Sequence, residues 1–260
     1  MGRILDKNKR IGEINISKEG YKMKIIEYND FHNIWIEFQD EHKAKIHTAY
    51  QHFKNGQVKN PYHRSIFNIG YIGEGKYNGK THPIIYKVWH SMIQRCYDPC
   101  YLNEHPTYRD CIVCEEWHCF QNFAKWWEEN VYNCNNERME LDKDILAKGN
   151  KIYNPETCLI VPKRINTLFI KNNRRRGKYP IGVSEYYDKK WGYRKLSVSC
   201  NTLESKKTLG YFPLSEPFHA FYAYKQFKEN YIKQVADEYK DLIPQRLFEA
   251  MYKFEVEIND

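Results

Sequence analysis

Long apolar runs are missing from this chain of 260 residues. No segment has the roughly 18 apolar residues that a membrane-spanning helix needs. The opening stretch, MGRILDKNKRIGEINISKEG, also lacks the uninterrupted apolar centre of a secretion signal. We therefore expect a cytosolic protein with no membrane partner. A reducing cytosol disfavours a disulfide framework, so the eight cysteines are expected to be thiols or metal ligands.

Acidic residues are in the minority, because 33 Asp and Glu stand against 41 Lys and Arg, a net charge of +8. This balance favours an acidic partner such as nucleic acid. The 22 Tyr and 6 Trp supply rings that stack on bases or simply fill small cores. The hydrophobic content of 42% supports folded cores, and the length fits one large domain or two to three small ones.

The first 78 residues are expected to form a small β module, because YKMKIIEYN and NIWIEFQD are rich in strand-forming residues and flank a turn. A Gly- and Asn-rich segment then precedes two helices, over residues 83–97 and 115–132. Apolar residues recur in both at helical spacing. The first helix is expected to bury Ile85, Val88, Trp89, Met92 and Cys96, and the second Trp117, Phe120, Ala124, Trp127 and Val131.

A turn-rich acidic segment follows, with the sequence MELDKDILAKGNKIYNPETCLIVPKRIN from Met139. It predicts a strand, a long loop, a second strand at residues 158–162 and a helix from Lys163. Asp142 at the first strand's end and Asn166 on the helix are oxygen donors that could hold one hard divalent cation. A solvated strand end with local ion pairs is the alternative interpretation.

The same segment resembles the nuclease core of phage HNH homing endonucleases, in which two strands and a helix surround one metal ion. RCYDPCYLNEHPTYRDCIVCEEW and YNPETC extend the resemblance over residues 84–173. It implies that Asp142 and Asn166 bind Mg²⁺ or Mn²⁺ and that DNA is cleaved. Thr157 stands where many members have another asparagine, and Lys143 stands where the histidine base belongs.

Lys143 is the main departure from this family. A lysine with its usual pKa of about 10.4 stays protonated near neutral pH, whereas a histidine does not. Lys143 is therefore expected to contact a phosphate oxygen or stabilise charge in the transition state. His105 or His118 could supply the base, although lone histidines are more often packed or surface residues.

Four cysteines have spacing that allows a structural zinc site. Cys111 and Cys114 form a CxxC pair and Cys96 and Cys100 a looser one, with Cys158 as the replacement for Cys100. The zinc set is thus Cys96, Cys111, Cys114 and Cys158. Reduced cysteines packed in the core are the competing interpretation.

The segment KNNRRRGK contains no acidic residue and is typical of a linker. Its Arg174, Arg175 and Arg176 are expected to follow a DNA backbone, enter a minor groove or remain solvated. Three strands are expected beyond it, at 181–187, 191–200 and 206–212. A long helix follows, capped by Ser215, and then a short terminal helix with Leu247, Met251 and Phe254 at helical spacing.

This C-terminal pattern resembles the ethylene-response-factor type of DNA-binding domain, which lays a three-stranded sheet in the major groove. The matching positions are Gly182, Val183, Trp191, Tyr193, Lys195, Ser197, residues 209–212, Ala220 and Tyr224. Strand alternation points Trp191, Tyr193, Lys195 and Ser197 outward and Arg194, Leu196 and Val198 toward the helix. The expected DNA contacts are Lys189, Lys190, Trp191, Tyr193, Lys195, Lys206 and Lys207.

The sequence thus predicts an α+β protein with a β module over 1–78, an HNH-like core with flanking helices over 79–173 and a sheet-and-helix DNA-binding domain over 174–260. Its predicted function is that of a phage or mobile-element homing endonuclease acting on double-stranded DNA in the host cytoplasm. The rival hypothesis is a catalytically decayed HNH-like protein that acts as a DNA-binding or regulatory factor. An RNA-binding or host-interaction factor is a third.

Overall fold

The computed structural model describes residues 9–170 and 177–260 of the chain. It combines helices with antiparallel strands, which confirms the α+β class. The chain divides into two compact units, Met1–Trp127 and Glu128–Asp260, and each is described by itself. The domain boundaries near residues 78 and 173 stay predictions. Among the described residues, no helix is both long enough and apolar enough to cross a membrane.

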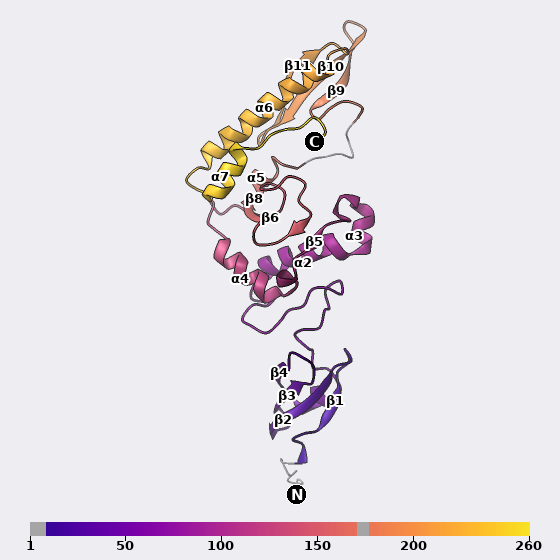
Figure 1. Ribbon diagram of the computed structural model, residues 1–260, viewed down its shortest axis with the longest axis vertical. Helices are drawn as coiled ribbons and strands as arrows, with labels where there is room; N and C mark the ends of the chain where they lie inside the picture. Colours follow the sequence, from indigo (N-terminus) through magenta and orange to yellow (C-terminus); the bar gives the residue numbers. More distant parts are fainter. Residues whose placement is uncertain (1–8, 171–176) are drawn as a thin grey trace. The chain divides into compact units, whose positions relative to one another are not determined.

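The first unit begins with a four-stranded antiparallel sheet in the order β1-β2-β3-β4 (Figure 1). The strands are β1 (Ile14–Ile16), β2 (Lys22–Asp30), β3 (Asn33–Phe38) and β4 (Lys45–Thr48), and helix α1 (Tyr50–Lys54) follows. Alternate residues of β2 and β3, such as Met23, Ile25, Ile34 and Ile36, are fully buried. The period of two therefore explains why these segments form strands, as predicted.

This unit also contains helix α2 (Pro83–Tyr97) and helix α4 (Phe120–Asn130) as far as Trp127, with α3 (Pro99–Glu104) and the short strand β5 (Ile112–Val113) between them. The predicted apolar face of α2 is buried except for Val88, which is half-buried. Val131 was expected to be buried, but α4 ends one residue earlier and Val131 is 41% exposed. Trp117 is fully buried, as predicted, but it belongs to a 3₁₀ turn that precedes α4.

In the second unit, β6 (Met139–Asp142) pairs antiparallel with β8 (Leu159–Pro162), and Asp142 lies opposite Leu159. The connecting loop holds the short strand β7 (Ile152–Tyr153), and α5 (Lys163–Asn166) is a single turn. Val161, Ile165 and Leu168 from this region share one core with residues of the two C-terminal helices. The predicted strand, loop, strand and helix are therefore present, but the helix is very short.

The C-terminal sheet is antiparallel in the order β11-β10-β9. Its strands are β9 (Val183–Asp188), β10 (Tyr193–Asn201) and β11 (Lys206–Phe212), and α6 (Pro217–Glu238) runs along one face (Figure 1). Leu196 and Val198 are fully buried against this helix, as alternation predicts. Helix α7 (Gln245–Tyr252) packs against α6 through Leu247 and Met251.

Three local expectations for this domain are wrong. Helix α6 is preceded by Glu216 rather than capped by Ser215, because Pro217 takes the first helical position that suits its fixed φ. Arg194 remains exposed and forms an ion pair with Glu185 instead of packing under the sheet. Phe254 lies beyond the end of α7.

Gly182, at the entrance to β9, has a structural requirement for glycine. Its φ of +78° lies in the left-handed region, and a Cβ built there would approach Tyr224 Cδ2 to 2.1 Å. A side chain at this position would both strain the backbone and displace the Tyr224 ring. This close approach seats the start of the sheet on α6.

Candidate nucleic-acid interface and acidic turn

The face of the C-terminal sheet opposite α6 is defined by strand register. Lys195 lies opposite Tyr186, and Ser197 lies between Ser184 and Tyr211. Together with Asp188 and Tyr193, these side chains form what we call the outer face. Its seven members are Ser184, Tyr186, Asp188, Tyr193, Lys195, Ser197 and Tyr211.

Lys195 occupies the centre of the outer face. Its Nζ lies 4.2, 5.5 and 5.7 Å from the ring centres of Tyr211, Tyr186 and Tyr193. The same ammonium lies 2.6 Å from Asp188 Oδ2. This hydrogen bond lowers the pKa of Asp188 and raises that of Lys195. The central cation is therefore held in place, and its charge is largely neutralised.

The turn between β9 and β10 extends the outer face at one end. Asp188 Oδ1 accepts the backbone N–H groups of Lys190 and Trp191 at 3.1 and 3.3 Å. Gly192 completes the turn with a φ of +69° and donates its N–H to Asp188 O at 2.8 Å. Lys189 and Lys190 are exposed, and Trp191 is 66% exposed. This turn therefore presents two cations and one large ring to solvent.

The remaining predicted DNA contacts do not form one surface with these residues. Lys206 is exposed opposite Asn201, at the other end of the sheet. Lys207 lies opposite the buried Cys200, with its Nζ 5.7 Å from the ring centre of Phe227 on α6. Lys207 is thus on the helix side of the sheet. The expectations for Arg174, Arg175 and Arg176 lie outside the described residues.

Tyr186 and Tyr211 frame Lys195, but they were not among the expected DNA contacts. Alternation within VSEYYD would have placed Tyr186 on the same face as Ser184. The position of Tyr211 was harder to read, because the pairing of β10 with β11 shifts register between Val198 and Ser199. Such a bulge breaks the simple two-residue period.

Asp142 caps the tight turn that follows β6. Its Oδ1 accepts the backbone N–H groups of Asp144 and Ile145 at 2.8 and 2.7 Å. Burial raises the pKa of Asp142, and these two hydrogen bonds oppose that shift. Oδ1 of this carboxylate therefore has a structural role at the turn. Oδ2 is the other oxygen, which could act as a metal ligand.

Lys143 is directed into its own loop. It is 7% exposed, and its Nζ donates to both carboxylate oxygens of Asp144, at 2.7 and 2.8 Å, and to Asn150 O at 2.6 Å. The Asn150 amide in turn donates to Lys143 O and to Thr157 Oγ1. In this arrangement Lys143 stabilises the loop rather than reaching toward a bound phosphate.

Asn166 contacts Glu140 rather than Asp142. Its Nδ2 donates to Glu140 Oε2 at 2.9 Å, and Glu140 is two residues before Asp142 on β6. Glu140 was not among the expected site residues, although the period of two places it on the same side of the strand as Asp142. This contact orients the Asn166 amide. Its carbonyl oxygen could act as a metal ligand.

A divalent metal ion at this turn stays a prediction. Within residues 9–170 and 177–260, no group of three or more His, Cys, Asp or Glu side chains is placed to hold a metal ion. Mg²⁺, however, is usually bound by one or two carboxylates, with waters and substrate phosphates completing the shell. Asp142 and Asn166 offer oxygen donors of that kind.

The two histidines considered as the base belong to the first unit. His118 is buried, its Nε2 donates to Val113 O at 3.0 Å, and burial lowers its pKa. His105 stacks on Tyr101 with 4.3 Å between ring centres. These contacts explain both residues as parts of the local packing.

The predicted zinc ligands are divided between the units. Cys96 on α2 and Cys111 before β5 are buried, and Cys114 after β5 is half-buried, all in the first unit. Cys158 is buried just before β8 in the second unit. The zinc site stays a prediction.

The family resemblances also stay predictions. Comparison with family models, with curated proteins and with solved structures gives no match for this chain.

Proposed function

We propose that this protein binds duplex DNA with the outer face of its C-terminal sheet and the adjoining turn, and that it is an HNH-type endonuclease. The observation that carries the DNA-binding part is the lysine framed by three tyrosines on an uncovered sheet face. A sheet of this kind can enter the major groove, where strands read base edges.

The charges suggest how the contacts are divided. Lys195 is already paired with Asp188, so its main contribution is to position the three surrounding rings. The exposed Lys189 and Lys190 are the cations suited to phosphates, a contact that is independent of sequence. Ser184 and Ser197 supply hydroxyls suited to base edges or to the sugar–phosphate backbone.

Cleavage is assigned to the acidic turn. Asp142 Oδ2 and the Asn166 carbonyl oxygen would hold Mg²⁺ or Mn²⁺, with Glu140 orienting the Asn166 amide. A divalent cation bound there supplies Lewis-acid stabilisation of the charge that develops on a phosphodiester. The general base is unassigned.

The alternative is a DNA-binding or regulatory factor whose nuclease core has lost activity. Lys143 favours this alternative, because it stands at the position of the family's histidine and its ammonium is used inside the loop. Both proposals share the sheet as the DNA-binding surface, so they differ only in the chemistry at the turn.

One experiment separates these proposals. Binding of a labelled duplex and nicking of supercoiled DNA are measured with Mg²⁺, Mn²⁺ or chelator, for wild type and Asp142→Asn. Asparagine keeps the oxygen that caps the turn but removes the charged metal ligand. Metal-dependent nicking that is lost in Asp142→Asn while binding persists supports the endonuclease.

Binding without nicking in wild type selects the regulatory alternative. Structured RNA that displaces the duplex at equal concentration would contradict DNA as the preferred partner. Replacing Lys189 and Lys190 together by Met should weaken duplex binding and reduce its salt dependence. An unchanged affinity would contradict the proposed surface.

A further inference from the structure

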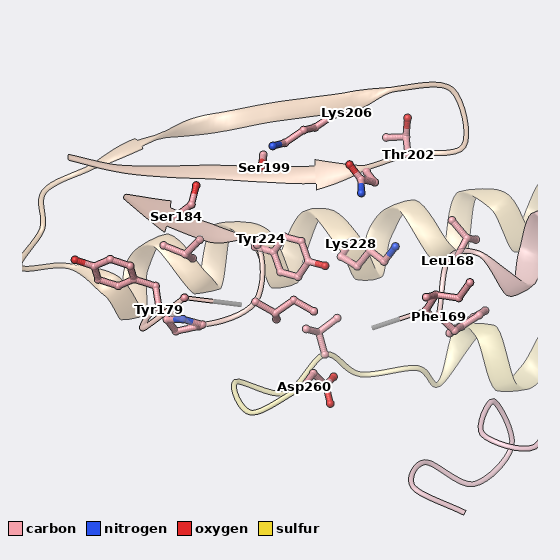
Figure 2. Close-up of a pocket in the computed structure, with 18 of the residues that line it drawn as sticks. Leu168, Phe169, Tyr179, Ser184, Ser199, Thr202, Lys206, Tyr224, Lys228 and Asp260 are labelled. Atoms are coloured by element: carbon pink, nitrogen blue, oxygen red, sulfur yellow. The ribbon is translucent and has the colours of Figure 1, made fainter. Parts of the chain in front are cut away.

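A cavity of about 800 Å³ lies in the second unit, between α6, the end of β10 and the C-terminal segment (Figure 2). Its walls include the aromatic side chains of Tyr224 and Phe254 and the polar side chains of Ser199 and Thr202. Pockets of roughly 300–1,000 Å³ typically hold small organic molecules. The mixture of rings and hydroxyls suits a ligand with both an apolar and a polar part.

Lys228 extends into this cavity from α6, one helical turn after Tyr224 (Figure 2). It is 9% exposed, and within the described part of the chain its ammonium has neither a hydrogen bond nor an ion pair. Burial lowers the pKa of Lys228. The adjacent Cys200 provides no negative charge, because burial raises the pKa of its thiol.

Lys228 differs in this respect from other poorly exposed lysines of the same unit. Lys143 pairs with Asp144 at 2.7 Å, and Lys195 pairs with Asp188 at 2.6 Å. A poorly exposed ammonium without a counter-charge costs free energy, which is relieved when the group deprotonates or is paired. An anion bound in the cavity would supply the counter-charge that Lys228 lacks among the described residues and would keep it protonated.

The carboxylates that line the cavity are already used. Asp260 forms an ion pair with Lys148 at 2.7 Å, and Glu185 forms one with Arg194. A second lysine, Lys206, also lines the cavity. The positive charge that remains is suited to a dianion rather than to a singly charged group.

We propose that this cavity binds a small organic phosphate, with the phosphate paired to Lys228 Nζ and the organic part packed against Tyr224 and Phe254. Charge-assisted hydrogen bonds from lysines and hydroxyls are the usual means of holding phosphate oxygens. The cavity lies beside α6, and this inference does not depend on DNA binding.

The test is calorimetric titration of the full chain with adenosine 5′-monophosphate, inorganic phosphate and adenosine. Lys228→Met keeps the length and apolar character of the side chain, and Lys233→Met on the same helix, outside the cavity lining, is the matched control. Affinity for the monophosphate should fall about tenfold or more in Lys228→Met and stay unchanged in Lys233→Met. Adenosine should bind more weakly than the monophosphate.

Equal affinity in Lys228→Met and wild type would overturn the proposal, because the phosphate would then bind elsewhere on this basic protein. The absence of binding of both phosphate probes to wild type at millimolar concentration would also overturn it. Acetylation of wild-type lysines, followed by mass spectrometry, gives a readout that needs no variant. The monophosphate should slow acetylation of Lys228 but not of Lys233, and equal rates with and without it would contradict the site.

Discussion

The Lys195 ammonium lies 2.6 Å from the Asp188 carboxylate, across the pair of strands β9 and β10. The same carboxylate caps the β9–β10 turn through its other oxygen. One acidic residue thus fixes both the central cation of the outer face and the turn that carries Lys189 and Lys190. This arrangement limits the positive charge available to DNA while keeping the surface ordered.

Replacing Asp188 by Asn should strengthen DNA binding. Asparagine keeps the Oδ1 acceptor of the turn but releases the charge of Lys195. Duplex affinity at low salt should rise several-fold, and the slope of log K against log salt should steepen by about one unit. Fluorescence anisotropy over a salt series measures both quantities. Asp241→Asn makes the same charge change at an exposed site on the segment after α6, so equal effects of the two variants would contradict a local role for Asp188.

Two substitutions of Asp142 should differ in their effect on stability. Its pKa in the folded protein is raised above the ordinary value of 3.8, so the charged form makes folding less favourable at neutral pH. That cost fades as the pH falls through the folded-state pKa toward 3.8. Asp142→Asn should therefore be more stable than wild type at pH 7, with a difference that vanishes at low pH.

Asp142→Ala, by contrast, should lose about 1–2 kcal/mol relative to Asp142→Asn, because two backbone N–H groups lose their acceptor. Urea unfolding at pH 7 and pH 4 gives these differences. Added Mg²⁺ should raise the free energy of unfolding of wild type but not of Asp142→Asn. An equal response of both proteins would argue against Asp142 as a metal ligand.

Alternation correctly predicted the burial of Leu196 and Val198 on β10, but it also pointed Arg194 toward the helix, and that residue is exposed and paired with Glu185. The arrangement at the acidic turn was not predictable in the same way. Nothing local in the sequence distinguishes a lysine that contacts a ligand from one that turns inward to Asp144 and Asn150. Likewise, the sequence around Lys228 is that of an ordinary polar position on a helix. Its side chain becomes poorly exposed only because three separate segments of the chain pack around it.

Gly182→Ala should destabilise the C-terminal sheet and helix by about 2–4 kcal/mol. The new Cβ would lie 2.1 Å from Tyr224 Cδ2, and the φ of +78° is unfavourable for alanine. Gly192→Ala is the matched control, since its φ is +69° and nothing lies within 4 Å of the added atom. It should cost only about 1–2 kcal/mol. Equal losses in urea unfolding would mean that Tyr224 moves aside freely.

Lys143→Met tests whether this residue serves the loop or the chemistry. It removes the hydrogen bonds to Asp144 and Asn150 and leaves a backbone carbonyl without its donor. The expected loss is about 1–3 kcal/mol in the free energy of unfolding, moderated because the Asp144 side chain is half exposed and can be hydrated. The exposed Lys163→Met should change stability by less than about 0.5 kcal/mol.

Duplex affinity should be retained in Lys143→Met, since the outer face is untouched. If instead stability is unchanged and only DNA cleavage is lost, the ammonium acts on substrate phosphate and the inward contacts are secondary. If cleavage survives, once the variant is assayed well below its unfolding temperature, the histidine position of the family is dispensable here. The decayed-core alternative would then lose the observation that favours it.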